Sequence, residues 1–543
     1  MTNMFTHLTF PRRIFSCLLS SFLVWLSFPN FIEKSLDPWG APLAWIALVP
    51  LFIALRGTTG KQSAWLGFVF GFAQLGSIVY WIAILEEAKY LGCWAWAALV
   101  FYLSFYFLLF GWLYTRSMEK LKLPGLWVAP FLWVALEYIR GSRPWGGFNW
   151  GEIGFTQAAN PSLLYLTSFT GIYGMTFLIV WANASFSDGF YKFGDPLLDR
   201  SVKNRTTLFL KYFLLPILVI GVCWGIGKYR IESTVLRKAG TVVLLQPNID
   251  QSVKWSHAFE TETYDRYKKL LSGSEHLKPD LILWPETGAP AYLLWDPKVL
   301  AKVSGMVKKT RTPQLVGCLD IENDRKGTIR YYNAAVHFDK SGTPKGVYRK
   351  RHLVPFGEFI PFQKYLKFLG PIVSNLGSFD SGKEYKKFQA KTFTYSPNIC
   401  YEAVFSDDVR QSLANQADAI VNISNDAWYG HTAAAFQHAL MEVTRSAEER
   451  RPLLRAANTG IYLVTDPFGR IIEWSPFFIQ ETLKGDVLTA SENQTFYFKH
   501  GNWLPEICLV VTFCLFLMIF YWSRNKGRPF VGNTRQPNHT PDI

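Results

Sequence analysis

Charged residues are scarce in this chain of 543 residues. Asp, Glu, Lys and Arg make up only 18% of it, whereas 49% is hydrophobic and 17% aromatic. This composition excludes a single soluble domain of ordinary kind, in which about 25% of residues are charged. Residues 1–228 and 502–522 are strongly apolar, and the stretch between them has the mixed composition of a globular domain. The chain therefore combines membrane segments with one soluble domain.

Cysteine is also sparse and scattered. Five of the seven Cys lie in apolar segments, which leaves Cys318 and Cys400 in the soluble stretch. This scatter does not indicate a disulfide scaffold, and no closely spaced Cys/His cluster indicates zinc, so we expect two reduced thiols, no metal and no organic cofactor. Lys and Arg outnumber Asp and Glu by 56 to 41, but no long basic run accompanies the excess. We therefore expect no nucleic-acid partner.

Apolar stretches long enough to cross a bilayer, about 20 residues each, follow one another through the first part of the chain. We predict seven spans there and an eighth near the C-terminus: 14–32, 41–55, 63–85, 91–115, 124–140, 161–187, 208–227 and 503–523. The predicted organisation is a seven-span membrane domain over 1–230, a soluble domain over 231–500, a transmembrane helix over 501–525 and a cytoplasmic tail over 526–543.

Lys and Arg gather in alternate loops between these spans. They are Arg12, Arg13, Arg56, Lys61, Arg116, Lys120, Lys122, Lys192, Arg200, Lys203 and Arg205. Because loops rich in Lys and Arg face the cytoplasm, the soluble domain is expected on the outer side. In a bacterium this arrangement is that of a multi-pass inner-membrane protein whose soluble domain lies in the periplasm.

One outer loop departs from this charge rule, since it carries Arg140 and Arg143. It is also rich in Gly and Trp and ends at Trp150. We consider two interpretations: an aromatic belt at the membrane interface, or a rim that faces the soluble domain and admits lipid. Glu137, near the end of the preceding span, is expected to be an interface residue rather than a buried proton relay.

In the soluble stretch, short runs of apolar and β-branched residues alternate with helical patterns. The predicted strands are Thr241–Leu245, Leu281–Trp284, Gln314–Gly317, Ala334–Phe338, Thr392–Ile399, Ala419–Ile423 and Tyr462–Thr465. Helical periodicity covers Glu260–Leu271 and Phe436–Arg450. Continuous apolar strands between helices predict a layered α/β domain whose sheets are largely buried.

Three polar motifs stand where such strands end, and they contain Glu286, Lys350 and Cys400. Taken singly, these residues have ordinary explanations: a turn residue, a solvated basic face and a small buried hydrophobe. Together they supply a base, a cation for an oxyanion and a thiol nucleophile. No Gly-x-Ser-x-Gly turn indicates a serine hydrolase. No His has a spacing that singles it out as the partner of a catalytic Cys.

The motifs Trp284-Pro-Glu-Thr287, Tyr348 to Pro361 and Asn398-Ile-Cys-Tyr-Glu402 resemble those of the nitrilase, or carbon–nitrogen hydrolase, superfamily, whose triad is Glu-Lys-Cys. With seven spans before this domain and one after it, the chain resembles the bacterial apolipoprotein N-acyltransferases. Further agreement comes from the segments 246–255, 424–430 and 455–460. The resemblance implies a polytopic α-helical membrane region plus an α/β nitrilase-like αββα sandwich over residues 240–490.

The resemblance also implies an activity. Cys400 would take a fatty acyl chain from the sn-1 position of a phospholipid, most simply phosphatidylethanolamine, as a thioester. The α-amine of the S-diacylglyceryl cysteine of an apolipoprotein would then accept the chain, giving a triacylated lipoprotein. Glu286 is implied as general base and Lys350 as the cation for the oxyanion. A monomer is expected.

Further residues have implied supporting roles. Glu358, Glu402 and Tyr401 would support the triad, with Glu358 orienting Lys350, and Trp255 and Trp150 would bind substrate. The apolar segment Phe359–Leu369 is interpreted either as a lid near the lipid or as an ordinary core helix.

Two other functions are kept as alternatives. One is a membrane-bound nitrilase-type amidase or hydrolase that passes the acyl group to water. The other is a catalytically dead lipid-binding scaffold on the same fold. The presence of Glu286, Lys350 and Cys400 together argues against the scaffold, which has no need for all three.

Overall fold

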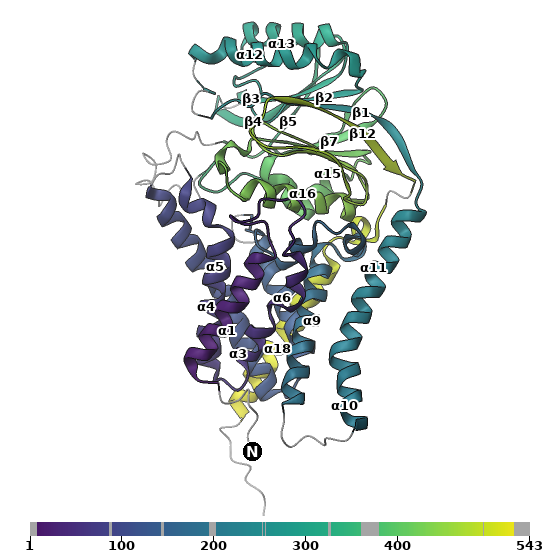
Figure 1. Cartoon of the computed structure of the whole chain (residues 1–543). Helices are drawn as coiled ribbons and strands as arrows, with labels where there is room; N and C mark the ends of the chain where they lie inside the picture. Colours follow the sequence, from purple (N-terminus) through teal and green to yellow (C-terminus); the bar gives the residue numbers. More distant parts are fainter. Residues whose placement is uncertain are drawn as a thin grey trace, which may run out of the picture.

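In the computed structural model, an α/β domain stands on one end of a bundle of long helices (Figure 1). The α/β domain is formed by residues 236–490. The structure describes residues 8–525 except for 86–89, 143–145, 195–201, 252–253, 256, 324–326, 360–378 and 492–493. All of the segment Phe359–Leu369 except Phe359 itself lies outside the described residues, so the lid stays a prediction.

The helix bundle contains helices in every range where a span is predicted. They are α1 (Phe10–Leu26), α2 (Ala44–Ala47), α3 (Val49–Leu55), α4 (Gly60–Ile78), α5 (Tyr90–Lys120), α6 (Gly125–Ser142), α7 (Pro161–Leu164), α8 (Thr167–Thr170), α9 (Ile172–Phe193), α10 (Val202–Phe209), α11 (Leu215–Ser233) and α18 (Trp503–Asn525). A short π-helix, Leu210–Leu214, joins α10 to α11.

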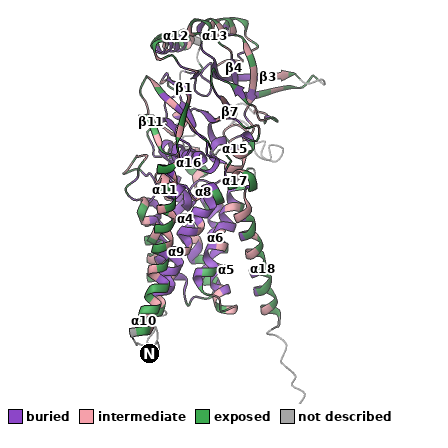
Figure 2. Ribbon diagram, turned by 90° about the vertical axis from the view of Figure 1, so that its right-hand side faces the viewer, coloured by how far each residue is buried: buried purple, intermediate pink, exposed green. Residues whose placement is uncertain are grey.

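Three helical segments of the described chain are long and apolar enough to cross a membrane: Leu91–Lys120, Lys203–Ser233 and Trp503–Arg524. A fourth is added if α7–α8 and α9, bent by 112° at their junction, count as one broken span. Much of the outer surface of α10, α11 and α18 is exposed (Figure 2), and large apolar side chains such as Val222 and Val510 lie on it. Such a surface suits contact with lipid. The bundle is a membrane region, and the count of eight spans stays a prediction.

The cationic loops meet at the end of the bundle that is farther from the α/β domain (Figure 1). Arg13 donates to the backbone oxygens of Ala54 and Arg56. Arg56 forms a buried ion pair with Asp188. The side chain of Arg116 lies against Gly60. Loops that are far apart in the sequence therefore share one end, as the alternation of charge predicts.

Two six-stranded sheets make up the middle of the α/β domain. The first has the order β12 (Glu481–Ala490), β1 (Leu236–Gln246), β2 (Leu281–Leu283), β3 (Gln314–Asn323), β4 (Ile329–Phe338), β5 (Pro344–Arg349). The second has the order β11 (Ile471–Ser475), β10 (Tyr462–Thr465), β9 (Leu453–Ala457), β8 (Ala419–Ser424), β7 (Thr394–Ile399), β6 (Phe388–Gln389). Parallel pairs, β1 with β2 and β7 with β8 among them, lie at the centre of each sheet.

Helices cover the outer face of each sheet. On the first sheet, α12 (Glu260–Ser272) and α13 (Pro297–Thr310) form the layer farthest from the membrane bundle (Figure 1). On the second, α15 (Ser406–Ser412) and α16 (Ala434–Glu449) lie next to the bundle. The two inner faces pack on each other through buried side chains such as Leu283, Ile399 and Val421. The predicted αββα sandwich is confirmed.

All seven predicted strands are strands in the structure, although β2 ends at Leu283. The reason is that each is an apolar run buried on both faces. Four edge strands, β5, β6, β11 and β12, and the central strand β9 are not in the prediction. Of these, β11 and β12 are partly exposed and have mixed sequences. The helix α12 matches the predicted Glu260–Leu271, and α16 begins two residues before the predicted Phe436.

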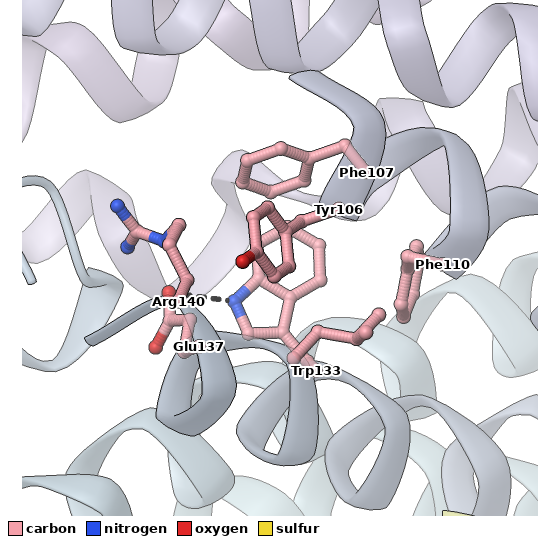
Figure 3. Close-up of a pocket in the computed structure, with 7 residues that line it drawn as sticks. Tyr106, Phe107, Phe110, Trp133, Glu137 and Arg140 are labelled. Carbon is pink, nitrogen blue, oxygen red and sulfur yellow. Dashed lines mark hydrogen bonds between the residues drawn. The ribbon is translucent and has the colours of Figure 1, made fainter. Parts of the chain in front are cut away.

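Glu137, which is expected at the membrane interface, is enclosed by the protein and not exposed at the end of its span. Its side chain is buried beside Trp133 (Figure 3), where it accepts hydrogen bonds from Trp133 Nε1 (2.9 Å), Ile153 N (3.1 Å) and Thr176 Oγ1 (3.0 Å). A buried carboxylate requires such partners. Glu137 therefore holds the segment around Ile153 against the bundle.

The outer loop runs under the α/β domain. Arg140 is buried and donates to the backbone oxygen of Trp150 (2.7 Å), which explains its departure from the charge rule; Arg143 lies outside the described residues. Trp150 is only 1% exposed, so it is not part of an aromatic belt. Its indole Nε1 donates to Gln437 on α16 (2.7 Å), and Asn149 donates to the backbone oxygen of Val404 (2.7 Å). This loop joins the bundle to the α/β domain.

Candidate active site

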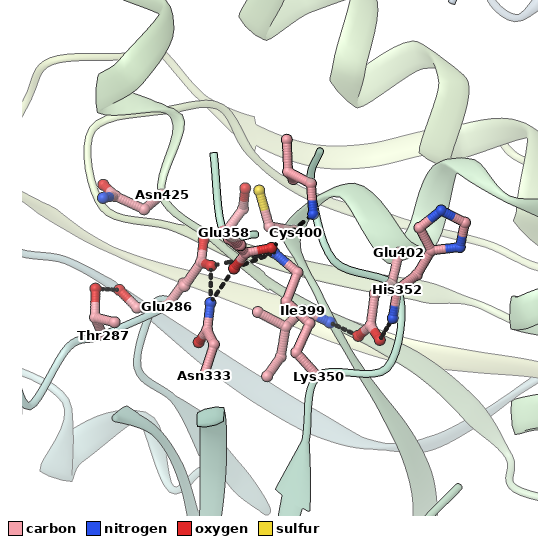
Figure 4. A network of polar contacts seen from close by, with 12 residues as sticks. Glu286, Thr287, Asn333, Lys350, His352, Glu358, Ile399, Cys400, Glu402 and Asn425 are labelled. Atoms are coloured by element: carbon pink, nitrogen blue, oxygen red, sulfur yellow. Dashed lines mark hydrogen bonds and ion pairs between the residues drawn. The ribbon is translucent and has the colours of Figure 1, made fainter. Parts of the chain in front are cut away.

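The three residues predicted as a triad meet between the two sheets. Glu286 follows β2 and Lys350 follows β5, both in the first sheet, whereas Cys400 follows β7 in the second. The Nζ of Lys350 lies 3.6 Å from Glu286 Oε1. Figure 4 shows the sulfur of Cys400 beside this group. All three side chains are less than 10% exposed, so their charges act on one another with little screening by water.

The backbone of Cys400 has a left-handed conformation. Its φ of 53° is unfavourable for a residue with a side chain and marks a sharp turn between β7 and the short helix Cys400–Val404. Asn422 on β8 holds this turn from both sides: its Oδ1 accepts from Cys400 N (3.0 Å), and its Nδ2 donates to Cys400 O (2.9 Å). The thiol is thereby aimed at Glu286 and Lys350.

Lys350 lies between two carboxylates. Its Nζ is 2.9 Å from Glu358 Oε2 and 3.0 Å from Glu358 Oε1, in addition to its contact with Glu286. Burial alone would lower the pKa of Lys350, but Glu358, Glu286 and Cys400 together raise it above its ordinary value. The ammonium group therefore stays protonated. The geometry supports the predicted orientation of Lys350 by Glu358.

Asn333 on β4 bridges the same two carboxylates. Its Nδ2 donates to Glu286 Oε1 (2.6 Å) and to Glu358 Oε1 (2.9 Å). Its backbone oxygen accepts from Lys350 N (2.8 Å). Hydrogen bonds to charged groups are roughly twice as strong as those between neutral groups, so Asn333 keeps the carboxylates in fixed positions.

Asn333→Leu is expected to slow formation of the acyl-enzyme roughly 10- to 100-fold, because Glu286, the predicted base, loses a charge-assisted hydrogen bond. Single-turnover mass spectrometry of the acylated protein would measure this rate. Asn323→Leu, at the exposed far end of β3, is the matched control and should leave the rate unchanged. Equal rates in Asn333→Leu and the unsubstituted protein would contradict the role of Asn333.

Cys400 is held as a thiol in the resting site. Burial raises the pKa of the Cys400 thiol, and the charge of Glu286 raises it further, while Lys350 and a hydrogen bond with Ser424 oppose this rise. A thiol whose pKa is raised is not a thiolate at neutral pH. Attack on a carbonyl therefore requires a base to take the proton, and Glu286 is the carboxylate beside it.

Glu402 ties the Lys350 segment to the Cys400 segment. Its carboxylate accepts from Arg351 N (2.6 Å), His352 N (3.1 Å) and Ile399 N (2.6 Å), as well as from the Tyr348 hydroxyl (3.0 Å). Burial raises the pKa of Glu402, and these backbone donors oppose that rise. The carboxylate thus fixes Lys350 and Cys400 relative to each other, which suits the supporting role predicted for Glu402.

The three aromatic residues predicted near the site have different environments. Tyr401 is 6% exposed, and its ring stacks on that of Trp150, with centroids 6.4 Å apart. Trp150 is covered by Tyr401, Tyr429 and His438, so it supports the site from below. Trp255 is 50% exposed. Substrate binding by Trp150 and Trp255 stays a prediction, and of the two only Trp255 offers a free surface.

A second lysine, Lys254, lies close to the base. It is 3% exposed, and its Nζ donates to the backbone oxygen of Glu286 (3.0 Å). Burial lowers the pKa of Lys254 to about 8, although the Glu286 carboxylate opposes the shift. Lys254 holds the turn that carries the base.

Lys254→Met is expected to alter how stability depends on pH. In the unfolded chain a Lys pKa is about 10.4, so folding releases a proton between pH 8 and that value. Below pH 8, Lys254 is protonated in both the folded and the unfolded state, and the buried charge lowers the free energy of unfolding. As the pH rises above 8, Lys254 loses its proton in the folded state and this destabilisation disappears. The change in Tm caused by Lys254→Met should therefore be more favourable at pH 7 than at pH 10. A change in Tm that is the same at both pH values, as expected for the exposed control Lys308→Met, would contradict the lowered pKa of Lys254.

A buried charge cluster supports the floor of the site. Arg455 on β9 pairs with Asp426 (2.9 Å) and with Glu442 on α16 (2.8 Å), and all three are at most 1% exposed. Burial alone would raise the pKa of Asp426, but Arg455 and His438 hold it below its ordinary value. Ser424 donates to Asp426 (2.8 Å) and also contacts the Cys400 thiol. Two motifs noted in the sequence, 424–430 and 455–460, meet in this cluster.

Within the described parts of the chain, no group of three His, Cys, Asp or Glu side chains could hold a metal ion. Cys318 and Cys400 are both free. Cys318 packs among buried residues between the first sheet and its helices, on the face away from Cys400.

Sequence reasoning missed Asn333, Asn422 and Lys254. The first two are polar residues inside apolar strands, Tyr332-Asn-Ala-Ala335 and Ala419-Ile-Val-Asn-Ile-Ser424, and a polar residue in a buried strand is a signal that could have drawn attention. Lys254 directly precedes Trp255 and carries no comparable signal.

Comparison with known proteins agrees with this geometry. Residues 241–491 match the family model described as carbon-nitrogen hydrolase, so fold and site define a member of that class. Residues 20–185 match the model of the apolipoprotein N-acyltransferase N-terminal domain. The apolipoprotein N-acyltransferase of Geobacter metallireducens is 33% identical over 513 residues, covering 92% of this chain and 94% of that protein. The chain belongs to the apolipoprotein N-acyltransferase family.

A second relative matches a similar share of the chain, and one solved structure matches about half of it. The apolipoprotein N-acyltransferase of Haemophilus influenzae is 30% identical over 508 residues, which cover 91% of this chain and 93% of that protein. Among solved structures, an amidase from Nesterenkonia sp. is similar, with a TM-score of 0.36 and 14% identity over 50% of this chain and 99% of that one.

Proposed function

We propose that this protein transfers a fatty acyl chain from a membrane phospholipid to the N-terminal α-amine of a diacylglyceryl apolipoprotein. The observation that carries the proposal is the convergence of Glu286, Lys350 and Cys400 in an α/β domain that stands on a membrane bundle. Both substrates carry acyl chains whose transfer into water costs about 0.8 kcal/mol for each CH₂. A site held next to the membrane avoids this cost.

In the first half of the reaction, Cys400 Sγ attacks the ester carbonyl of the phospholipid while Glu286 takes the thiol proton. The C–S bond forms, and the carbonyl oxygen becomes an oxyanion that the ammonium group of Lys350 stabilises. When the C–O bond of the ester breaks, Glu286 returns the proton to the leaving alkoxide. The products are a lysophospholipid and an acyl thioester on Cys400.

In the second half, the α-amine of the apolipoprotein attacks the thioester carbonyl. Glu286 takes a proton from the amine, and Lys350 again stabilises the oxyanion. The C–S bond breaks, an amide forms, and the thiol of Cys400 is restored by the proton that Glu286 holds. A thioester is reactive enough toward an amine for this step, whereas the original ester is less so.

Finer features of the proposal concern the substrates and the location. We assign the sn-1 chain of phosphatidylethanolamine as the donor, a monomer as the active form, and the periplasmic side of a bacterial inner membrane as the place of the α/β domain. The support for the location is that the cationic loops meet at the opposite end of the bundle, as expected for a cytoplasmic side.

The full chain in liposomes, supplied with labelled phosphatidylethanolamine and a diacylated lipopeptide, provides the test. Mass spectrometry should detect the N-acylated lipopeptide and a Cys400 acyl thioester. Free fatty acid as the main product would instead assign a hydrolase. Lipid binding without any turnover would assign a scaffold.

A further inference from the structure

A groove lies between α5 and α18 at the end of the bundle that is farther from the α/β domain. Its volume is about 460 Å³, which is within the range of small-molecule sites. It is lined by Trp112, Arg116 and Lys120 from α5 and by Phe516, Ile519, Phe520, Trp522 and Ser523 from α18. The groove takes no part in the reaction described above, because β7, the strand that ends just before Cys400, lies beyond the other end of these helices (Figure 1).

One wall of the groove carries two cations near its mouth and an aromatic residue deeper in the bundle. Trp112, Arg116 and Lys120 are spaced four residues apart, so they lie on one face of α5 with the apolar residue deepest in the bundle. Glu119 pairs with Arg116 (2.8 Å) and lies 3.6 Å from Lys120, and it neutralises only one of the two charges. A positive charge therefore remains at the mouth of the groove.

The other wall is aromatic and apolar. Phe516 and Phe520 are 41% and 51% exposed, whereas Ile519 is buried at the base. The rings also hold cations at the rim: Lys120 Nζ lies 4.1 Å from the centroid of the Trp522 ring, and Arg524 lies 5.1 Å from that of Phe520. Aromatic and cationic residues together are typical of the level of lipid head groups.

We propose that this groove binds an anionic glycerophospholipid of the leaflet farther from the α/β domain. The phosphate would lie between Arg116 and Lys120, and an acyl chain would lie along Phe516 and Phe520. A phosphate alone fits only the rim, and an uncharged lipid would leave the excess positive charge at the mouth of the groove without compensation. A basic pocket between transmembrane helices with an apolar lower wall is complementary to a lipid that has both a negative head group and a chain.

The test uses the full chain, freed of lipid in a neutral detergent, with native mass spectrometry as the readout. Phosphatidylglycerol should bind more tightly than phosphatidylethanolamine with the same chains. The double substitution Arg116→Gln and Lys120→Gln should weaken phosphatidylglycerol binding roughly 10- to 30-fold, as expected for two cations at a membrane surface. The matched control, Lys203→Gln with Arg205→Gln on α10, removes the same charge at the same end and should change binding by less than about twofold.

A second variant keeps the test informative if the first one folds poorly. Arg116→Lys with Lys120→Arg keeps both charges and should keep the preference for phosphatidylglycerol. Equal binding of the two lipids, or equal loss in the α10 control, would overturn the proposal. So would binding of inorganic phosphate as tight as that of phosphatidylglycerol, or a dimer that forms through the groove and excludes lipid.

Discussion

Cys400→Ser is expected to lower N-acylation of a diacylated lipopeptide by about 10³-fold or more. A hydroxyl is a weaker nucleophile than a thiol, and its proton is far harder for a carboxylate such as Glu286 to remove. The measurement is the rate of N-acyl lipopeptide formation by the full chain with labelled phospholipid. Cys400→Ala gives the baseline of a site without any nucleophile.

Cys318→Ala is the matched control for this substitution. It removes the other thiol of the α/β domain, which is buried on the far side of the first sheet, and should leave acyl transfer intact if the variant folds. An acyl adduct on Cys318, or N-acylation by Cys400→Ser at the rate of the unsubstituted protein, would refute the mechanism.

Lys350→Met is expected to slow acyl-enzyme formation by about 10²- to 10³-fold, the usual effect of removing an oxyanion donor. The loss has a second cause. Burial raises the pKa of the Cys400 thiol and the charge of Lys350 opposes that rise, so without the ammonium group the thiol is harder to deprotonate. Glu286 then takes the thiol proton less readily at neutral pH.

The pH profile of single-turnover acylation separates these two causes. If the thiol of Cys400 has become harder to deprotonate, the activity that remains in Lys350→Met should rise as the pH increases from 6 to 9, more steeply than in the unsubstituted protein. Lys345→Met, five residues earlier on β5, removes an exposed lysine paired with Asp339 and is the control. An unchanged rate in Lys350→Met would show that the cation has no part in the chemistry.

The α/β sandwich was predictable because most of its central strands are apolar runs buried on both faces. The central strand β9, which contains Arg455, was not predicted although it is buried. Runs such as Leu281–Leu283 and Ala419–Ser424 consist mainly of apolar residues, so their composition alone predicts buried strands. The edge strands β11 and β12 have one exposed face, and their mixed sequences could not be distinguished from loops.

The site was only partly predictable for a related reason. Glu286, Lys350 and Cys400 are visible because each follows an apolar run and matches a family motif. The residues that hold them are not visible in this way. Asn333 contacts Glu286 across 47 positions, and Trp150 contacts Gln437 across 287. Such contacts depend on how distant strands and domains pack together, and no short sequence motif predicts this packing.

Glu137 shows the limit of reading polarity from a membrane segment. A carboxylate near the end of a span is compatible with an interface, and only the donors around it, Trp133, Ile153 and Thr176, show that it is buried. Two of these three come from segments that follow in the chain by 16 residues or more.

The docking of α16 on the membrane bundle means that the two halves of this chain are not interchangeable modules. Gln437 donates to the backbone oxygen of Pro29 and accepts from Trp150, and Glu448 accepts from the backbone nitrogen of Ile172. If the α/β domain were excised, these groups would lose their partners and the buried side chains around them would meet water. A chimera built from two relatives therefore has to exchange α16 together with the loop that contains Trp150, since these contacts, and not either half alone, fix how the α/β domain sits on the bundle.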